Sequence, residues 1–244
     1  MNERQNLILN YLKEHRSAAV STLARILFVS EATVRRDLVL IERSGLIRRT
    51  HGGAMLSYGA EEVSLFVRMN ENRRKKEEAV RRALPHVPSD FKTVFLDSSS
   101  TALMLVEKLP LQNKTIVTNN LQSALRLSKF DGVDIVIPGG NLYSSSSSVK
   151  GAWTNSLLSE FRFDLMICSC AAVANGGVYE SALDQREIKR IAHNNSAFHI
   201  LLLDNTKLSG QGTYLVAPLS RYEVVALDSY ADDDLETLKG AHLV

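Results

Sequence analysis

Cysteine is scarce in this chain: Cys168 and Cys170 are the only two among 244 residues. They alternate along one predicted strand, without the CxxC spacing of a redox pair and without metal ligands beside them. His193 and His199 also lack the spacing of metal ligands. We therefore expect reduced thiols in a core, with neither a metal nor another cofactor.

Long hydrophobic runs are absent as well. No apolar stretch reaches the roughly 18 residues that span a bilayer, and the opening MNERQ is too polar to begin a signal peptide. These absences argue against an integral membrane protein and predict a cytoplasmic protein with no membrane partner. Hydrophobic residues still make up 45% of the chain, which is enough for a sizeable core.

The net charge is small, +2, but it is unevenly distributed. Residues 1–82 hold 16 Lys and Arg against 10 Asp and Glu, a net +6, while residues 83–244 hold 13 against 17, a net −4. A basic N-terminal part joined to a mildly acidic remainder predicts a nucleic-acid-binding module on a domain of its own.

Three short helices are predicted in the basic part. Apolar residues recur at helical spacing over Asn2–Glu14 and again after Ser21, which we expect to cap a second helix. Phe28–Val29 makes a tight turn, and Ser30 is placed to cap a third helix. Two helices joined by a few residues, the second of them basic on its exposed side, predict a helix-turn-helix.

The third helix has two different faces. Apolar residues at i, i+4 and i+7 form one face: Val34, Leu38 and Ile41. Thr33, Arg35 and Arg36 point away from it, near the end of the helix that reads base edges in DNA-binding proteins of this type. Taken alone, these residues are equally typical of an ordinary amphipathic helix with solvated arginines.

A basic hairpin is predicted after this helix. The helix should end near Ser44–Gly45 with a left-handed glycine cap, and Leu46–Ile47 begins a short strand. The segment Arg48–Ala54 reads RRTHGGA, in which the glycines allow a turn. It is therefore a candidate wing, and three of its side chains are candidates for contacts with the DNA backbone: Arg48, Arg49 and His51.

Residues 29–54, VSEATVRRDLVLIERSGLIRRTHGGA, resemble the signature of the DeoR family of bacterial transcriptional regulators. In that family a T-[IV]-R-R-D-L recognition helix is followed by an R-x-H-G-G-A wing. The resemblance implies a repressor of a carbohydrate-use operon that binds double-stranded operator DNA as a dimer or tetramer. The expected DNA-binding residues are Ser21, Ser30, Thr33, Arg35, Arg36, Arg48, Arg49 and His51.

From Phe91 onward the pattern changes to strands alternating with helices. The predicted strands are Thr93–Leu96, Thr115–Val117, Val133–Ile137, Leu165–Cys168, His199–Leu203 and Val224–Leu227. The predicted helices between them are Ala102–Leu109, Leu121–Lys129 and Gln185–Asn194. This repeated unit predicts an α/β domain with a mostly parallel sheet covered on both faces, whose ligands bind at the carboxyl ends of the strands.

The loop DSSST, Asp97–Thr101, is the best ligand candidate because it joins a strand end to a helix N-terminus. Free backbone N–H groups and the helix dipole favour an anion at such a place. The hydroxyl groups of Ser98, Ser99, Ser100 and Thr101 could bind phosphate oxygens. The alternative is that Ser99 or Ser100 simply caps the following helix.

Residues 73–228 resemble the DeoR effector domain, which is similar to the folds of ribose-5-phosphate isomerase and coenzyme A transferases. The resemblance implies a phosphorylated sugar as the effector. The family loop is typically D-x-G-[ST]-T, and here Asp97, Ser100 and Thr101 match while Ser99 replaces the glycine. If that glycine normally has a positive φ, Ser99 is strained or the loop is reshaped.

Further segments match the family and are implied to line the effector site. These residues are Thr118, Asn119, Asn120, Gly139, Gly140, Lys150, Gly151 and Lys207. Each match also has a simpler interpretation. The asparagines can cap a helix, the glycines can make a turn, and Lys207 can pair with Asp204 on the surface.

Two charged helices are expected to be solvated. One is Asn72–Arg82, whose Arg73–Lys76 could instead contact phosphates. The other carries Asp184, Glu187 and Lys189, which could instead line the effector site or a subunit interface. The predicted domains are 1–57 and 73–244, with a linker over 58–72. The alternatives to an effector-controlled repressor are a sugar-phosphate isomerase with an attached DNA-binding module, and a regulator with a non-phosphorylated effector or none.

Overall fold

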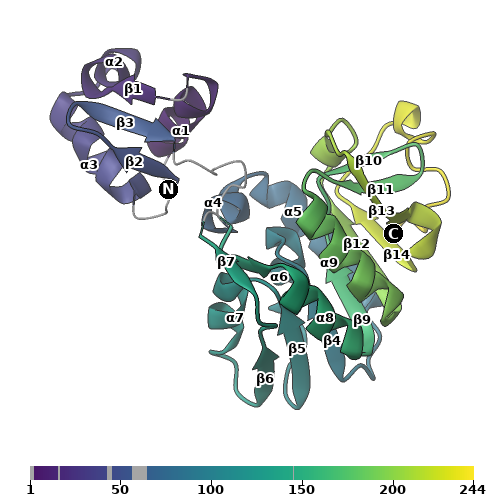
Figure 1. Cartoon of the computed structure of the whole chain (residues 1–244). Helices are drawn as coiled ribbons and strands as arrows, with labels where there is room; N and C mark the ends of the chain where they lie inside the picture. Colours follow the sequence, from purple (N-terminus) through teal and green to yellow (C-terminus); the bar gives the residue numbers. More distant parts are fainter. Residues whose placement is uncertain (1–2, 16, 43–45, 57–64, 145) are drawn as a thin grey trace. The chain divides into compact units, whose positions relative to one another are not determined.

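The computed structural model describes residues 3–15, 17–42, 46–56, 65–144 and 146–244. The chain divides between Glu71 and Asn72 into an N-terminal and a C-terminal unit, each with its own hydrophobic core (Figure 1). The predicted end of the third helix at Ser44–Gly45 lies outside the described residues. The domain boundaries at 57 and 73 stay a prediction.

The N-terminal unit packs three helices on a small antiparallel sheet. Its elements are α1 (Glu3–His15), β1 (Ser17–Ala19), α2 (Val20–Ile26), α3 (Glu31–Glu42), β2 (Ile47–Arg49) and β3 (Gly53–Leu56), with α4 (Leu65–Asn70) after them. The sheet order is β1-β3-β2. The core is formed by the predicted apolar helix faces, including Ile8, Leu12, Leu23 and Val34, none of which is exposed.

The C-terminal unit is built on a six-stranded sheet in which every pair of neighbours is parallel. Its strands are β4 (Thr93–Leu96), β5 (Lys114–Thr118), β6 (Val133–Val136), β9 (Phe163–Cys168), β12 (Ser196–Leu203) and β14 (Val224–Leu227). Successive residues of a strand point to opposite faces, and Val94, Phe95 and Leu96 are all fully buried. Both faces of the sheet are therefore covered at β4, as predicted.

One α-helix of the C-terminal unit precedes the first strand of the large sheet, and the other α-helices of this unit lie between its strands in the chain. They are α5 (Arg73–Ala83), α6 (Ser100–Val106), α7 (Leu121–Leu127), α8 (Ala152–Glu160) and α9 (Leu183–Asn194), with short 3₁₀ turns at Leu84–His86, Asn205–Lys207, Leu219–Arg221 and Asp232–Asp234. Contacts join α5 to β12 and β14, α6 to β4 and β9, and α9 to β9 and β12. The strand and helix pattern of the sequence is thus confirmed for the large sheet.

Strand order places a topological switch point between β4 and β9. The order is β14-β12-β9-β4-β5-β6, so the chain builds outward from β4 in one direction and from β9 in the other (Figure 1). In open parallel sheets, ligands bind outside the carboxyl ends of the strands at such a point. The loops after β4 and β9 are therefore the first places to look for a site.

Several short strands were not expected from the sequence. The strands β10 (Ala172–Ala174), β11 (Gly177–Glu180) and β13 (Tyr214–Pro218) form an antiparallel sheet of their own, and β7 (Asn141–Tyr143) pairs with β8 (Ser148–Lys150). In the N-terminal unit, β1 lies between the two predicted helices, where the sequence predicts no strand. Three residues carry too short an alternation to distinguish a strand from a loop.

Both cysteines lie in the core, as predicted, and neither forms a disulfide. Burial raises the pKa of Cys168 well above its usual range and that of Cys170 to about 12, so both stay protonated thiols.

No group of three or more His, Cys, Asp or Glu side chains within the described residues is arranged to hold a metal ion. Within those same residues no helix is long and apolar enough to cross a bilayer.

An aromatic cluster joins α9 to the sheet. The rings of His193 and His199 stack with centroids 4.0 Å apart, and Tyr222 meets His193 edge-on at 5.0 Å. Burial, followed by the nearby charges of His199 and Arg221, lowers the pKa of His193 to about 4. His193 is therefore neutral in the folded chain at neutral pH.

Acid should weaken the C-terminal unit through His193. Its pKa rises from about 4 in the folded chain towards 6.5 on unfolding, so the unfolded state takes up the proton first as pH falls. The free energy of unfolding should drop by about 3 kcal/mol between pH 6.5 and pH 4. Urea unfolding across this range measures the drop, and H193F should remove most of it. An equal drop in H193F would contradict this origin.

Candidate functional site

Helix α3 begins as the sequence predicts. Ser30 caps it, because Thr33 N donates to Ser30 Oγ at 3.2 Å and the Ser30 and Thr33 hydroxyl oxygens lie 2.9 Å apart. The predicted apolar face is confirmed, since Val34, Leu38 and Ile41 are at most 1% exposed. The prediction for Ser21 as a cap is wrong: α2 begins at Val20 after Ala19, so Ser21 lies inside the first turn.

The arginines of α3 differ in their surroundings. Both are exposed, but Arg35 Nη2 lies 3.3 Å from Glu31 Oε2, one turn earlier on the helix. Arg36 has no hydrogen-bond or ion-pair partner in the described part of the chain. A ligand can therefore accept hydrogen bonds from the Arg36 guanidinium group without first displacing a carboxylate.

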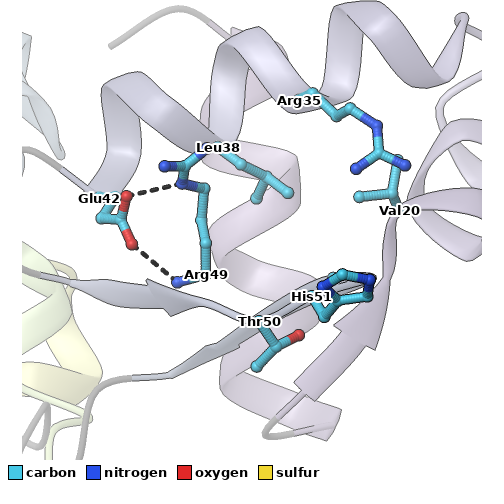
Figure 2. Close-up of a pocket in the computed structure, with 8 residues that line it drawn as sticks. Val20, Arg35, Leu38, Glu42, Arg49, Thr50 and His51 are labelled. Atoms are coloured by element: carbon cyan, nitrogen blue, oxygen red, sulfur yellow. Dashed lines mark hydrogen bonds and ion pairs between the residues drawn. The ribbon is translucent and has the colours of Figure 1, made fainter.

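A groove of about 390 Å³ lies between α3 and the β2–β3 hairpin (Figure 2). Its lining includes Val20, Arg35, Leu38, Glu42, Arg49, Thr50, His51 and Gly53. Arg49 is tied to α3, because its backbone N and its Nε donate to the two carboxylate oxygens of Glu42 at 2.9 and 2.6 Å. These bonds, with the backbone bond foremost, lower the pKa of Glu42. Arg49 thus positions the wing. Arg48, Arg49 and His51 are all exposed, but only Arg49 is tied to Glu42.

The two glycines of the hairpin have different roles. A Cβ on Gly53 would lie 2.1 Å from the carbonyl oxygen of Ala18, because β1 and β3 approach closely there. A Cβ on Gly52 would meet no atom within 4 Å. Gly52 O also accepts a hydrogen bond from Val20 N at 2.9 Å. Gly53 therefore allows the sheet to form, while Gly52 shapes only the tip.

The substitution G53A should destabilise the N-terminal unit, and G52A should not. The added methyl group of G53A forces β3 away from β1, at a cost of about 1–3 kcal/mol. Amide hydrogen exchange of residues 46–56 measures the loss, with G52A as the matched control. Equal exchange in the two variants would contradict the close approach of β1 and β3.

Asp37 is a residue of this surface that the sequence did not single out. It is 3% exposed on α3. Its Oδ2 accepts from Arg4 Nε at 2.5 Å and its Oδ1 accepts from Gln5 Nε2 at 3.0 Å. The only available signal was position, since Asp37 lies three residues after Val34 on the buried side of α3. Asp37 fixes α1 to α3 and so holds the arginines of α3 in place.

In the C-terminal unit the loop after β4 lies at the switch point and is buried throughout. The carboxylate of Asp97 accepts from Ser99 N at 2.9 Å and from Ser169 N, just after β9, at 3.2 Å. Lys189 Nζ of α9 lies 2.9 Å from Asp97 Oδ2 and also binds Glu180 of β11. Asp97 therefore joins the two central loops and is already engaged by protein groups.

The prediction that the charged face of α9 is solvated is wrong for Lys189. This lysine is 5% exposed, and besides the two carboxylates it donates to Ser169 O at 2.5 Å. Lys76, also expected to be solvated, is 6% exposed, and its Nζ donates to Ser100 Oγ at 3.1 Å. Helical spacing in the sequence could have indicated this burial. Lys76, for example, lies on the same buried face of α5 as Ala79, Val80 and Ala83.

The serines of this loop are divided between capping and site contacts. Ser99 has φ −81° and its Oγ accepts from Ala102 N at 3.1 Å, so it caps α6. The expected strain at Ser99 is therefore absent, because the position does not need a positive φ. Ser98 Oγ donates to Gln185 Oε1 at 3.4 Å. Thr101 is 3% exposed within the first turn of α6.

The neighbouring strand end brings a second polar group to the site. Leu96 of β4 pairs in register with Thr118 of β5, which places Asn119 beside Asp97 along the sheet edge. Asn120 caps α7 by accepting from Ser123 N at 2.9 Å, while Thr118 Oγ1 accepts from Asn120 N. Asn119 is fully buried, and its Oδ1 has no hydrogen-bond partner within the described residues. Asn119 Oδ1 is therefore a buried acceptor without a partner at the strand end, within the described residues.

The remaining candidates lie along the same edge. A Cβ on Gly140 would fall 2.2 Å from Thr154 Oγ1, so this glycine serves a close contact with α8, and Gly139 O accepts from the same hydroxyl at 2.7 Å. Lys150 is buried with its Nζ over the Tyr143 ring, and Gly151 precedes α8.

Lys207 is not paired with Asp204, contrary to the simpler interpretation. The Asp204 carboxylate instead accepts from Thr206 N at 3.2 Å and from the Thr206 hydroxyl. Lys207 itself is half-buried, and its Nζ has no hydrogen-bond partner among the residues that the structure describes. It remains available to an anion.

Comparison with known proteins assigns both units. Residues 4–57 match the DeoR-like helix-turn-helix domain and residues 71–229 match the DeoR C-terminal sensor domain. The transcriptional regulator GolR of Listeria innocua is 30% identical over 93% of this chain and 90% of its own length. The lactose phosphotransferase system repressor of Staphylococcus aureus is 27% identical, over 97% of this chain and 96% of its own. The repressor GlcR of Bacillus subtilis is 26% identical, over 93% and 88%.

Solved structures resemble the chain less closely. Ribose 5-phosphate isomerase A from Neisseria gonorrhoeae matches 56% of this chain and 53% of its own, at 16% identity and a TM-score of 0.40. A likeness at this level carries no argument about function. The named relatives are regulators rather than enzymes, and the family predicted from the residues is confirmed. The chain belongs to the DeoR family of transcriptional regulators, with a helix-turn-helix DNA-binding domain followed by a sensor domain.

Proposed function

We propose that this regulator represses a carbohydrate-use operon in the bacterial cytoplasm and is released from its operator by a phosphorylated sugar. The observation that carries the DNA side is Arg36, which is exposed and has no side-chain partner among the described residues, in the same domain as a basic wing. Two relatives that align over nearly their whole length are named repressors, one of them of a sugar phosphotransferase system. Binding to paired half-sites requires a homo-oligomer, a dimer or a tetramer.

The DNA-binding residues divide into readers and supports. Thr33, Arg35 and Arg36 read base edges from the N-terminal half of α3, and Ser30 holds that end. Arg48 and His51 contact phosphates from the wing, which Arg49 positions through Glu42. Ser21 lies in the exposed first turn of α2, where it can meet a phosphate.

The effector is proposed to lie across the carboxyl ends of β4, β5 and β12. Lys207 and the hydroxyl groups of the Ser98–Thr101 loop supply the anion-binding groups, and Asn119 Oδ1 accepts from a sugar hydroxyl group. Asp97 positions the loop rather than binding the ligand. The loops that carry Gly139, Gly140, Lys150 and Gly151 border the same edge, beside Thr118 and Asn120.

Duplex DNA selected from a random library by the full-length protein tests the operator side. R36A should weaken binding of the selected duplex by about 1–3 kcal/mol, while R81A, at an exposed position on α5, should not change it. Unchanged affinity in R36A would overturn the assignment of α3.

Thermal-shift screening against hexose phosphates, with the free hexoses as controls, tests the effector side. Stabilisation by a free hexose alone would show that the effector is not phosphorylated.

A further inference from the structure

Phe28, in the turn between α2 and α3, combines two unfavourable features. It is 95% exposed, and its φ is +53°, in the left-handed region. The turn around it is well formed, with Val29 N donating to Ala24 O at 3.0 Å. A bulky side chain is rarely found at such a φ, where glycine or asparagine is common.

The exposed ring stabilises nothing in the described part of the folded chain that would offset the strain and the exposure. A single exposed hydrophobic side chain is ordinary on a protein surface. At this position, however, Phe28 also strains the backbone, and glycine or asparagine would remove both the strain and the exposed ring. A residue held in a strained conformation at the surface points to a role in binding.

The position of Phe28 indicates the partner. It lies two residues before Ser30, the cap of α3, at the end of the helix that enters the DNA groove in this class of domain. The carbonyl oxygen of Arg25 accepts from Phe28 N. The side chain of Arg25 is exposed on α2 and, like that of Arg36, has no partner in the described part of the chain. Phe28 therefore lies in a turn between two helices that each carry an exposed arginine able to attract DNA.

We propose that Phe28 contacts operator DNA directly, packing its ring on thymine methyl groups or deoxyribose carbons next to the N-terminus of α3. The contact rests on the proposed binding of DNA through α3. It is apolar, so it adds affinity without neutralising a phosphate, unlike the arginines around it. Where the ring meets thymine methyl groups in the major groove, it also selects sequence.

The variants F28G and F28N keep the left-handed turn and remove the aromatic ring. The variant F28Y keeps the turn and an aromatic ring. L7A, which truncates a half-exposed side chain on α1, is the matched control. The full-length variants are titrated with the duplex selected by the unmodified protein, over a range of salt concentrations. The same duplex with deoxyuridine in place of thymidine separates methyl contacts from sugar contacts. Hydrogen exchange of residues 20–40 reports the stability of the turn.

The two readouts should move in opposite directions. F28G should bind the selected duplex about fivefold to tenfold more weakly, with an unchanged salt slope. Its α2 and α3 amides should exchange about threefold more slowly, since the strain is relieved. F28Y and L7A should bind like the unmodified protein. Weakening by deoxyuridine in the presence of Phe28 but not in F28G assigns the contact to thymine methyl groups, and equal effects assign it to deoxyribose.

Other results would overturn the contact. Unchanged or tighter binding by both F28G and F28N would show that the ring does not meet DNA. A smaller salt slope in F28G than in the unmodified protein would show that the loss arises from displaced cations. Failure to enrich any sequence from the library would contradict the proposed function, and the contact with it.

Discussion

Replacing Asp37 with alanine should strongly destabilise the DNA-binding domain and leave the sensor domain intact. Asp37 is nearly fully buried and accepts one hydrogen bond from Arg4 and one from Gln5, which is itself 5% exposed. D37A removes an acceptor of the buried Gln5 amide and the charge that Arg4 faces. The expected cost is about 3 kcal/mol. A domain of this size has only roughly 3–8 kcal/mol of stability to lose.

Urea unfolding followed by amide hydrogen exchange of α1 and α3 measures this loss. The matched control is E31A, which removes a carboxylate from the same helix but from an exposed pair with Arg35, worth less than about 1 kcal/mol. D37N, which keeps one acceptor for Gln5, should fall between the two. If D37A and E31A unfold at the same urea concentration, Asp37 does not hold α1 to α3.

The second large effect is expected at Lys189 in the sensor domain. Its ammonium group lies between Asp97 and Glu180, and all three side chains are at least nine-tenths buried. K189M keeps most of the side-chain volume but leaves two carboxylates facing each other without a cation. Breaking a buried ion pair in this way costs about 3–5 kcal/mol. We also expect weaker effector binding, because Asp97 shapes the loop after β4.

The adjacent variant R190M is the control for K189M. Arg190 is on the same helix, about half-exposed, and paired with Glu187. Its loss should change the free energy of unfolding by less than about 1 kcal/mol. Urea unfolding of the sensor domain compares the two variants directly. Adding E180Q to K189M should recover part of the lost stability, and the absence of any recovery would argue against the ion triad.

The large parallel sheet could be predicted because its strands are continuous apolar runs. β4 and β14 begin and end at the predicted residues. Such strands are buried on both faces and so contain almost no polar interruption. The strands β1, β10 and β13 could not be predicted, since each is short and pairs with a strand that its own residues do not indicate.

The local geometry of the candidate sites follows the sequence best where a motif stands alone and least where buried charges decide. Strand ends pointed to Asp97 and Asn119, and the cap at Ser30 followed from local chemistry. The lysines were misjudged because a charged helix is usually solvated, yet Lys76 and Lys189 each lie on the apolar side of their helix. The distinction between Arg36 and Arg49 needed the structure, because Glu42 is seven residues away from Arg49 in sequence.

The junction of Asp97, Lys189 and Glu180 has a consequence for how such regulators diverge. These three residues come from the loop after β4, from α9 and from β11, so they are far apart in the chain but share one buried charge balance. The cluster holds two carboxylates and one ammonium group, so loss of Lys189 leaves both buried carboxylates without a cation until a second position changes. Substitutions at these positions should therefore occur together among related sequences, and effector specificity should drift through the side chains around them.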